Sequence, residues 1–421
     1  MGAFVIRGCE IYLGGAFVPA ELEVRGGVVT ALGGGIVPGE GASVYNFKNC
    51  IVVPGLADVH VHLREPGFSY KETVASGTRA AARSGYAALC AMPNLSPVPE
   101  DAATLAQELD IIRRDAVIDV LPYGAITRGQ RGEQLADMSA MSPYVCGFSD
   151  DGRGVQSREL MRAAMLEAKR LGRPIAAHCE DNSLLRGGYI HEGEYAKAHG
   201  HRGICSESEW GPIARDIELL RETGCAYHVC HISTAESAAL IRSAKREGLD
   251  ITCETAPHYL LLSDSDLQED GRFKMNPPLR SERDRLALIE ALRDGTIDIL
   301  ATDHAPHSAE EKSRGLAGSA FGITGLETAF PLLWTGLVEP GIITRERLVE
   351  LMSTAPARRF GIESGIEPGG PATFAVFETE TTYRIDPERF ASKGRATPFA
   401  GREVRGRCVL NVVRGREVWR A

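Results

Sequence analysis

From about residue 54 onward, eight short apolar runs alternate with segments of helical periodicity. The runs are LADVHVH (56–62), YAALCAMPN (86–94), VIDVLPYGAIT (117–127), YVCGFSDDG (144–152), PIAAHCED (174–181), AYHVCHIST (226–234), DITCETAPHY (250–259) and IDILATDHAPH (297–307). Between them, stretches such as 157–172 and 234–248 space their apolar residues as amphipathic helices do, the second opening on Thr234 as N-cap. Strands that alternate with helices pair in parallel through right-handed crossovers. Eight such units close a barrel, so the sequence predicts an α/β fold, a (β/α)8 TIM barrel.

The two ends of the chain have a different pattern. Residues 1–52 are rich in glycine and carry short β-like pieces, and residues 366–421 return to the same style. Neither end is large enough to fold alone, because a small segment buries too little apolar surface. We therefore expect residues 1–53 and 358–421 to form one small composite β-sandwich domain, with residues 54–357 forming the barrel domain.

Composition and charge exclude several classes of partner. The formal net charge of the 421-residue chain is −9, which argues against nucleic acid or a membrane surface as a partner. No apolar run approaches the roughly 20 residues that span a bilayer, and the N-terminal residues do not form an export signal. The ten cysteines are spread along the chain without a CxxC pair, which favours buried reduced thiols. These features together predict a cytoplasmic protein.

Polar residues gather at the C-terminal ends of the apolar runs, the face where barrel enzymes build their active sites. They are His60, His62, Asn94, Asp150, Asp151, His178, His231, His258, Asp303 and His307. Taken singly, each histidine could be a core residue, and each aspartate could cap a turn or a helix. Four histidines and two aspartates at one barrel mouth instead form a ligand set for zinc or a similar divalent ion. Six ligands are more than one ion needs, and they suffice for two ions if one carboxylate bridges them. Such a site implies metal-assisted hydrolysis at a carbonyl centre, or the reverse reaction.

Parity along the strand separates site residues from core residues. His60, His62 and Arg64 alternate, so their side chains project from the same face of one strand. His228 lies off the parity of His231 and is interpreted as a core histidine. Asp58 shares the parity of His60, and the sequence assigns it no role. No serine or cysteine lies in a nucleophile elbow, and no glycine-rich phosphate loop follows a strand.

A family resemblance rests on nine motifs distributed over essentially the whole chain. They are PGLADVHVHLREPG, AMPN, FSDDG, AAHCED, HVCHIST, ETAPHY, KMNPPLR, ATDHAPH and FGITGLET. Together they resemble bacterial dihydroorotase of the type I branch of the amidohydrolase superfamily. The closing TPFAGREVRGR near residues 397–407 extends the resemblance into the small β domain.

The resemblance implies a metal-binding role for six residues, which would hold one or two zinc ions. His60 and His62 with Asp303 would bind the first ion, His178 and His231 the second, and Asp151 would bridge the two. Asp150 competes with Asp151 for the bridge, because the sequence leaves open which carboxylate points inward. The chain has no lysine at the end of the fourth run, so the carboxylated-lysine bridge of other amidohydrolases is not available.

The resemblance also implies a substrate site. The residues expected to hold the substrate are His62, Arg64, Asn94, Asn276 and His307, with backbone groups around Phe321 and Gly322. Asp303 would accept the proton of the attacking water and pass it to the leaving nitrogen. The polar segment 308–320 fits either a mobile lid or an ordinary exposed loop.

The implied reaction is the reversible cyclisation of N-carbamoyl-L-aspartate to (S)-dihydroorotate and water in pyrimidine biosynthesis. In the hydrolytic direction, a metal-activated hydroxide attacks the ring amide. A hydantoinase or allantoinase is the alternative, although those enzymes usually carry the bridging lysine and act on neutral rings. A non-catalytic partner of aspartate transcarbamoylase is a further alternative, which predicts missing ligands, whereas all six are present. We also expect a small-molecule substrate, a homo-oligomer and possible association with aspartate transcarbamoylase.

Overall fold

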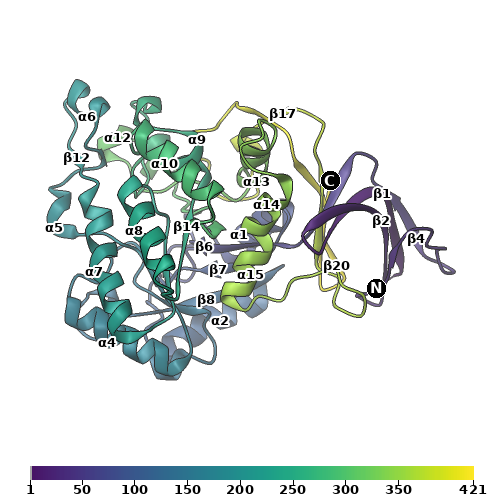
Figure 1. Cartoon of the computed structure of the whole chain (residues 1–421), viewed down its shortest axis with the longest axis horizontal. Coiled ribbons are helices and arrows are strands. Elements are labelled where there is room, and N and C mark those ends of the chain that lie inside the picture. Colours follow the sequence, from purple (N-terminus) through teal and green to yellow (C-terminus); the bar gives the residue numbers. More distant parts are fainter. Residues whose placement is uncertain (1) are drawn as a thin grey trace.

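The computed structural model describes residues 2–421, and eight parallel strands form the centre of the larger part (Figure 1). Their order is that of the chain, from β6 to β15, and each lies within one predicted apolar run. The strands are β6 (Leu56–Val61), β7 (Tyr86–Ala91), β8 (Asp119–Ala125), β9 (Gly147–Ser149), β10 (Ile175–Ala177), β13 (Tyr227–Val229), β14 (Ile251–Thr255) and β15 (Ile299–Leu300). Most of their residues are buried on both faces, as expected for a parallel sheet covered by helices.

The sheet nearly closes into the predicted barrel. Beyond β15, His304 forms a parallel bridge with Val61 of β6, and its carbonyl accepts a hydrogen bond of 2.9 Å from the His62 N–H. The Asp58 carboxylate accepts the Thr302 N–H at 3.2 Å across the same seam. These contacts join the first and last strands.

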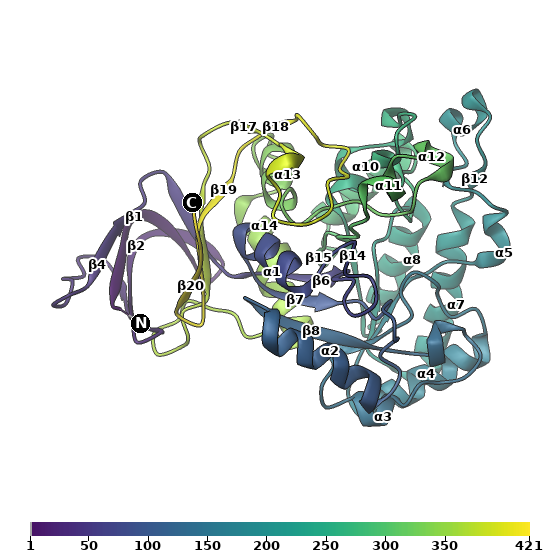
Figure 2. The same cartoon turned by 180° about the vertical axis from the view of Figure 1, so that it is seen from behind.

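Helices follow most of the strands and cover the outside of the barrel, as Figure 2 shows for α1 and α2. The predicted helix over 157–172 is α4, capped by Ser157, whose side chain accepts the Leu160 N–H, and ended by Gly172 at φ 65°. Thr234 caps α8 as expected, by accepting the Ser237 N–H. The longer helices are α1 (Val74–Arg83), α2 (Ala102–Asp115), α4 (Arg158–Leu171), α7 (Glu207–Thr223), α8 (Ala235–Arg246) and α10 (Glu282–Arg293).

Two connections at the mouth of the barrel are elaborated. After β10 the chain forms a small excursion that contains a two-stranded parallel ladder, which the sequence did not indicate. Its elements are α5 (Asn182–Leu185), β11 (Ile190–His191), α6 (Glu194–His199) and β12 (Gly203–Ile204). After β14 comes α9 (Pro257–Leu261), with 3-10 turns at Asp264–Asp266 and Gly271–Phe273.

The segment after β15 is also helical. It contains α11 (Ala309–Lys312), α12 (Gly315–Gly318), α13 (Ala329–Leu333), a π-helical turn Trp334–Val338, α14 (Arg345–Val349), a second π-helical turn Glu350–Thr354 and α15 (Ala355–Phe360). Residues 308–320 thus fold as two short helices, and Lys312 among them is buried rather than solvated.

Strands from both ends of the chain build the second sheet, and both termini lie beside it (Figure 1). Its strand order is β20-β19-β16-β5-β1-β2-β3, with β4 paired to β1. The members are β1 (Phe4–Leu13), β2 (Ala16–Arg25), β3 (Val28–Gly33), β4 (Ser43–Asn46), β5 (Cys50–Pro54), β16 (Phe374–Glu378), β19 (Arg407–Val413) and β20 (Arg416–Arg420). A two-residue turn joins β1 to β2, and Gly14 and Gly15 there adopt φ of 56° and 93°, as such hairpins require.

This sheet forms the predicted sandwich, because its two halves enclose one apolar cluster. Ile11 and Leu22 from the N-terminal strands pack in that cluster with Val52, Val376 and Leu410 from the other half. Alternate residues of the same strands face away and join the barrel core. The two cores therefore share strands β5, β16 and β19.

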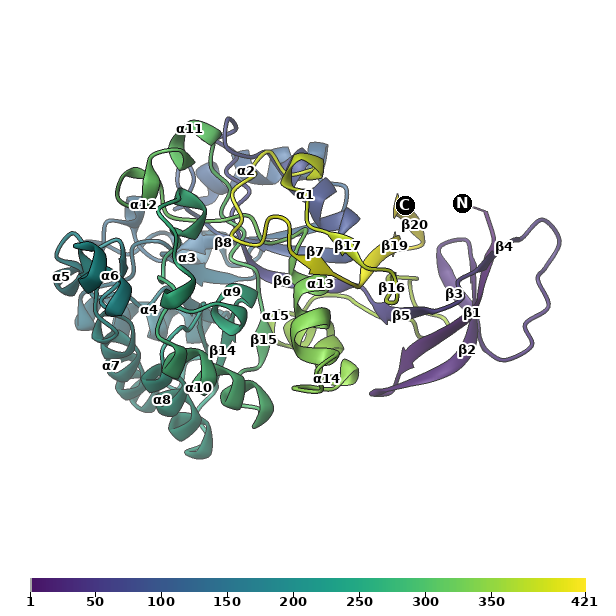
Figure 3. The same ribbon diagram turned by 90° about the horizontal axis from the view of Figure 1, so that it is seen from above.

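A C-terminal segment returns from the sandwich across the barrel, between β16 and β19 (Figures 2 and 3). It contains the strand pair β17 (Tyr383–Arg384) and β18 (Glu403–Val404) and a 3-10 turn at Pro387–Arg389. The Thr324 N–H donates to the Ala396 carbonyl at 2.8 Å, and Ser392 donates to Glu72. The segment is thereby fixed to the barrel mouth.

All ten cysteines are free thiols, and nine of them are buried, as the sequence predicted. Within residues 2–421, no helix has the length and apolar character to cross a membrane.

Candidate active site

The six predicted metal ligands come from five different strand ends and meet at the mouth of the barrel. Asp151 follows β9 and lies at the centre of the cluster. Its Oδ1 is 3.3 Å from His60 Nε2, 3.4 Å from His178 Nδ1 and 3.4 Å from His231 Nε2. Its Oδ2 is 3.4 Å from His62 Nε2. One carboxylate therefore faces all four histidines.

Asp303 completes the cluster from the end of β15. Its Oδ1 lies 3.1 Å from His62 Nε2 and 3.6 Å from His60 Nε2. All six side chains are almost completely buried. Two sets of ligand atoms lie within 4.8 Å of one another: His60, His62 and Asp303, and His60, Asp151 and His231.

The spacing of these atoms fits divalent metal. Most of the separations, 3.3–3.6 Å, exceed the common range for hydrogen bonds, about 2.7–3.2 Å. They match the edge of a tetrahedron about an ion with bonds of about 2.0–2.1 Å. Among residues 2–421, His60 Nε2 finds no hydrogen-bond partner although it is buried. The nitrogen and oxygen atoms of the cluster are therefore spaced better for binding a metal ion than for hydrogen bonding to one another.

The ionisation of the ligands is strongly coupled. Burial opposes the charge of Asp151, but the charge of His60 and hydrogen bonds from His178 and His231 hold its pKa well below the usual value. Burial likewise opposes a charged His178, yet Asp151 and Glu180 raise its pKa to about 10. Without a metal the cluster therefore retains protons on imidazole, and binding of a cation must displace them.

Glu254 is a functional residue that the sequence did not single out. It lies within β14, and its Oε1 accepts the Nδ1–H of His60 at 2.7 Å. Its Oε2 accepts the Nε2–H of His228 at 3.0 Å, which gives that core histidine a supporting role. The hydrogen bond fixes the tautomer of His60 that leaves Nε2 unprotonated and able to bind a metal. Glu254 is a single acidic residue in an apolar strand, and nothing in the sequence indicates that it contacts a histidine on another strand.

Cys230 lies with His60 and Glu254 in a third group of possible ligand atoms. Burial raises the pKa of its thiol to about 12, so it stays protonated and is a poor metal ligand.

The adjacent aspartates Asp150 and Asp151 have different environments. Asp150 accepts the backbone N–H groups of Ile126 at 2.9 Å and Thr127 at 3.1 Å, and it faces away from the histidines. Burial raises its pKa to about 6 despite these hydrogen bonds. Asp151 is therefore the carboxylate that faces the histidines, and Asp150 holds the loop after β8.

Asp58 also acquires a structural explanation. It is fully buried and accepts the backbone N–H of His60 at 3.1 Å and that of Thr302 at 3.2 Å. Burial raises its pKa to about 7. Asp58 thus ties the first ligand strand to the residue before Asp303.

Backbone strain is concentrated at this site. Arg64, His231 and Asp303 adopt positive φ values of 61°, 34° and 46°, which side-chain-bearing residues rarely adopt. Such conformations cost on the order of 1–3 kcal/mol each and persist where surrounding contacts impose them. Here they turn three polar side chains toward the barrel mouth.

Arg64 is buried beside the predicted metal ligands without a counter-ion. Its Nε donates to the Pro306 carbonyl at 3.3 Å, and it is 8% exposed. Among residues 2–421, no carboxylate lies within ion-pairing distance of its guanidinium, which is a costly state for a buried charge. His307 adjoins it, and the His307 Nε2–H donates to the Phe321 carbonyl at 2.7 Å.

The remaining expected substrate residues lie close by but make protein contacts. Asn94 Oδ1 accepts the His62 Nδ1–H at 2.7 Å, so this residue orients the imidazole of a predicted metal ligand. Asn276 Nδ2 donates to Glu180 at 2.8 Å. Gly322 has φ 126°, and a Cβ there would lie 2.6 Å from the Ala305 carbonyl oxygen, so only glycine fits.

His258, another polar residue of the strand ends, lies in the first turn of α9 and is buried. Burial lowers its pKa to about 4, and its Nε2 has no hydrogen-bond partner within residues 2–421. It is therefore a neutral imidazole, and its pKa is also influenced by the nearby Asp303 and His231.

Comparison with solved structures agrees with this architecture. The L-hydantoinase (dihydropyrimidinase) from Arthrobacter aurescens superposes with a TM-score of 0.88 at 25% identity, covering 100% of this chain and 96% of that one. A dihydropyrimidinase from Brevibacillus agri gives a TM-score of 0.86 at 22% identity, with 99% and 95% of the two chains covered. These similarities support the TIM barrel with its attached β-sandwich.

Sequence comparison identifies the family. A family model described as Dihydro-orotase-like matches residues 49–237. The dihydroorotase of Bacillus caldolyticus is 47% identical over 422 residues, which cover 100% of this chain and 99% of that protein. The dihydroorotase of Geobacillus kaustophilus is also 47% identical, over 423 residues, with the same coverage. The chain belongs to the dihydroorotase family of metal-dependent cyclic amidohydrolases.

Proposed function

We propose that this chain catalyses the dihydroorotase reaction, the reversible cyclisation of N-carbamoyl-L-aspartate to (S)-dihydroorotate and water in pyrimidine biosynthesis. The observation that carries the proposal is the buried, unpaired guanidinium of Arg64 next to a metal-ligand cluster. Both the ring product and its open precursor carry a carboxylate, which a planar guanidinium binds through paired hydrogen bonds. The neutral ring of a hydantoin offers no such partner.

The substrate would be positioned by residues on several strand ends. Arg64 would bind the carboxylate, and the amide nitrogens of Asn94 and Asn276 would donate to ring or carboxylate oxygens. Neutral His307 and the backbone at Phe321 and Gly322 would line the same side. Multiple donors with one positive charge fix orientation as well as affinity.

The metal would be zinc, one or two ions per subunit, because imidazole and carboxylate ligands suit it. The proposed ligands are His60, His62 and Asp303 for one ion, and His178 and His231 for a second, with Asp151 between them. Bound there, a divalent ion supplies polarisation of the ring carbonyl and a lowered pKa for water.

Asp303 is the proposed proton carrier. Burial opposes its charge, but the hydrogen bond from His62 and the charge of His60 keep its pKa below the usual value. It is therefore a carboxylate that can accept a proton from water and deliver it to the leaving nitrogen. In the direction of ring closure the same group returns the proton.

The experiment compares Arg64→Gln with the unchanged protein on two substrates, dihydroorotate and hydantoin, after loading with zinc. We expect the variant to lose about 100-fold or more in kcat/KM on dihydroorotate, since a charged hydrogen-bonded pair is worth about 2–5 kcal/mol. Its metal content, measured by mass spectrometry, should be unchanged. Arg384→Gln, an arginine paired with Glu403 at the surface, is the matched control.

Equal or faster turnover of hydantoin or allantoin by the unchanged protein would reject the dihydroorotase assignment in favour of a neutral cyclic amide. Absence of turnover of every ring by the zinc-loaded protein would instead favour a non-catalytic homologue. The six ligands at one barrel mouth argue against that alternative.

Domain division, location and assembly are further proposals. We infer a composite β domain of residues 1–53 and 358–421 and a catalytic domain of residues 54–357, with helix α15 crossing the second boundary. We also propose a cytoplasmic location, a homo-oligomeric state and association with aspartate transcarbamoylase. Sedimentation of the chain alone and with the transcarbamoylase tests the last two.

A further inference from the structure

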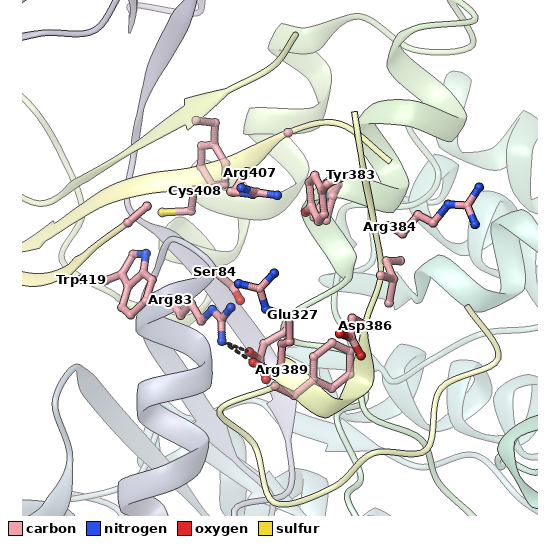
Figure 4. Close-up of a pocket in the computed structure, with 16 residues that line it drawn as sticks. Arg83, Ser84, Glu327, Tyr383, Arg384, Asp386, Arg389, Arg407, Cys408 and Trp419 are labelled. Carbon is pink, nitrogen blue, oxygen red and sulfur yellow. Dashed lines mark hydrogen bonds and ion pairs between the residues drawn. The ribbon is translucent and has the colours of Figure 1, made fainter. Parts of the chain in front are cut away.

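A second pocket, of about 640 Å³, lies away from the metal-ligand cluster at the junction of the barrel and the β-sandwich (Figure 4). It is formed by the C-terminal end of α1, the returning segment around residues 383–390, and strands β19 and β20. None of the proposed catalytic, metal-binding or substrate-binding residues lines it. Its size is in the range of sites for small organic ligands, about 300–1,000 Å³.

Positive charge dominates this pocket although the whole chain is acidic. In Figure 4 the side chains of Arg83, Arg389 and Arg407 converge on one hollow, from three different elements. Arg83 pairs with Glu327 at 3.6 Å. Arg389 and Arg407 form no ion pair within 4.0 Å in the part of the chain that the structure describes. Two guanidinium groups are thus available to an anion.

Of the two acidic side chains in the lining, Glu327 pairs with Arg83, and Asp386 forms no ion pair with Arg389 or Arg407 within 4.0 Å in the described residues. Glu327 is directed to backbone donors, since it accepts the N–H groups of Ala391 at 2.9 Å and Ser392 at 3.1 Å. Asp386 caps the 3-10 turn Pro387–Arg389 by accepting the Glu388 N–H at 3.1 Å.

Aromatic faces line the same hollow. The Arg83 guanidinium lies 5.4 Å from the ring centre of Trp419, and that of Arg407 lies 4.3 Å from the ring centre of Tyr383. Burial raises the pKa of the Tyr383 hydroxyl to about 12, so the ring stays neutral and its O–H remains a donor. A planar heterocycle can stack on such rings and between guanidinium planes.

We propose that this pocket binds a phosphate monoester that carries a planar heterocycle, the chemistry of a nucleoside monophosphate. Arg389 and Arg407 bind the phosphate, because a guanidinium fork matches phosphate oxygens and keeps its charge at any physiological pH. The ring stacks on the face of Trp419 or Tyr383 that the neighbouring guanidinium group leaves open. The site is separate from the barrel mouth and does not depend on the reaction catalysed there.

Isothermal titration of the zinc-loaded protein with UMP, AMP, ribose 5-phosphate and inorganic phosphate tests the proposal. We expect saturable binding of a nucleoside monophosphate, and binding of ribose 5-phosphate and phosphate at least tenfold weaker because they lack the ring. Arg389→Gln and Arg407→Gln should each weaken nucleotide binding about tenfold or more, since each removes a charged hydrogen-bonding group. Both positions are exposed, so thermal unfolding should be nearly unchanged in the variants.

Arg384→Gln is the control, because Arg384 belongs to the same pocket lining but its guanidinium is paired with Glu403 at 3.0 Å. It should bind the nucleotide as the unchanged protein does. Failure of both nucleotides to bind at millimolar concentration would overturn the proposal. Binding that survives the double variant Arg389→Gln/Arg407→Gln but is lost in Arg64→Gln would also overturn it, because the nucleotide would then occupy the barrel mouth.

Discussion

At the scale of single residues, two neighbouring aspartates perform different tasks because the backbone turns between them. Asp151 faces four histidines, whereas Asp150 accepts two backbone N–H groups of the preceding loop. We predict that Asp151→Ala loses bound metal and at least 1,000-fold in activity, as expected when a shared ligand is removed. Metal content by mass spectrometry and turnover of dihydroorotate measure both effects.

Asp150→Ala serves as the matched comparison. It should retain metal and part of the activity but unfold at a lower temperature, since two buried N–H groups lose their acceptor at about 1–3 kcal/mol each. The reverse ranking, with metal lost from Asp150→Ala and kept by Asp151→Ala, would assign the bridge to Asp150.

His307 predicts a pH dependence of stability. Its Nε2–H donates to Phe321, and its Nδ1 lies 3.2 Å from Lys71 Nζ and 3.5 Å from the Glu311 carboxylate. Burial, together with Arg64 and Lys71, lowers its pKa to about 3 in the folded state. In the unfolded chain the value is about 6.5. Between these limits the unfolded state binds more protons, so stability falls as the pH is lowered from 6.5 toward 3.

Urea unfolding at pH 6.5 and pH 5 measures this contribution. The unchanged protein should lose up to about 1.4 kcal/mol more per pH unit than His307→Gln, which has no proton to gain. Parallel pH profiles for the two proteins would show that His307 is not the acid-sensitive group.

At the scale of elements, one buried lysine organises the helices that follow the last barrel strand. Lys312, at the end of α11, donates from Nζ to the carbonyls of Lys274 at 3.0 Å, Ala320 at 2.8 Å and Gly322 at 2.7 Å. Two of these acceptors lie in the loop proposed to hold the substrate. These three hydrogen bonds therefore fix the backbone conformation of the loop that contains Phe321 and Gly322.

We predict that Lys312→Met raises the KM for dihydroorotate about tenfold or more and lowers kcat less, because the loop loses three hydrogen bonds while the metal ligands stay in place. Arg314→Gln, which removes an exposed pair with Glu310 on the same segment, should leave both constants nearly unchanged. A fall in kcat and metal content without a change in KM would contradict this role.

The positions of the strands and helices could be predicted from the sequence better than the side-chain contacts between them. All eight barrel strands lie within their predicted runs, because fully buried parallel strands are continuous apolar segments bounded by turns. The excursion with β11 and β12 was missed, since two-residue strands have no periodicity to detect. Glu254 and Asp58 were also unassigned, because their meaning depends on partners some 190 and 240 positions away along the chain. Segment 308–320 has a polar sequence, yet it folds around the buried Lys312.

At the scale of the whole molecule, the barrel and the β-sandwich share strands and therefore should unfold together. In β16, Val376 faces the sandwich core and Phe377 faces the barrel, where it stacks on Phe330 with ring centres 3.7 Å apart. In β19, the fully buried Asn411 donates from Nδ2 to the carbonyls of Ala82 and Tyr86, both at 2.8 Å. These contacts cross from the sandwich to the first helix and the second strand of the barrel.

We predict that Asn411→Leu destabilises the protein by about 2–4 kcal/mol, because it removes two buried hydrogen bonds while keeping a similar volume. Since both cores depend on the same strand, calorimetry should show one transition that moves to lower temperature as a unit. Glu417→Gln on the neighbouring strand β20, exposed and paired only with Arg420, should change stability by less than about 0.5 kcal/mol. Two separated transitions in Asn411→Leu would mean that the sandwich and the barrel fold independently, and that the shared strands serve only to dock them.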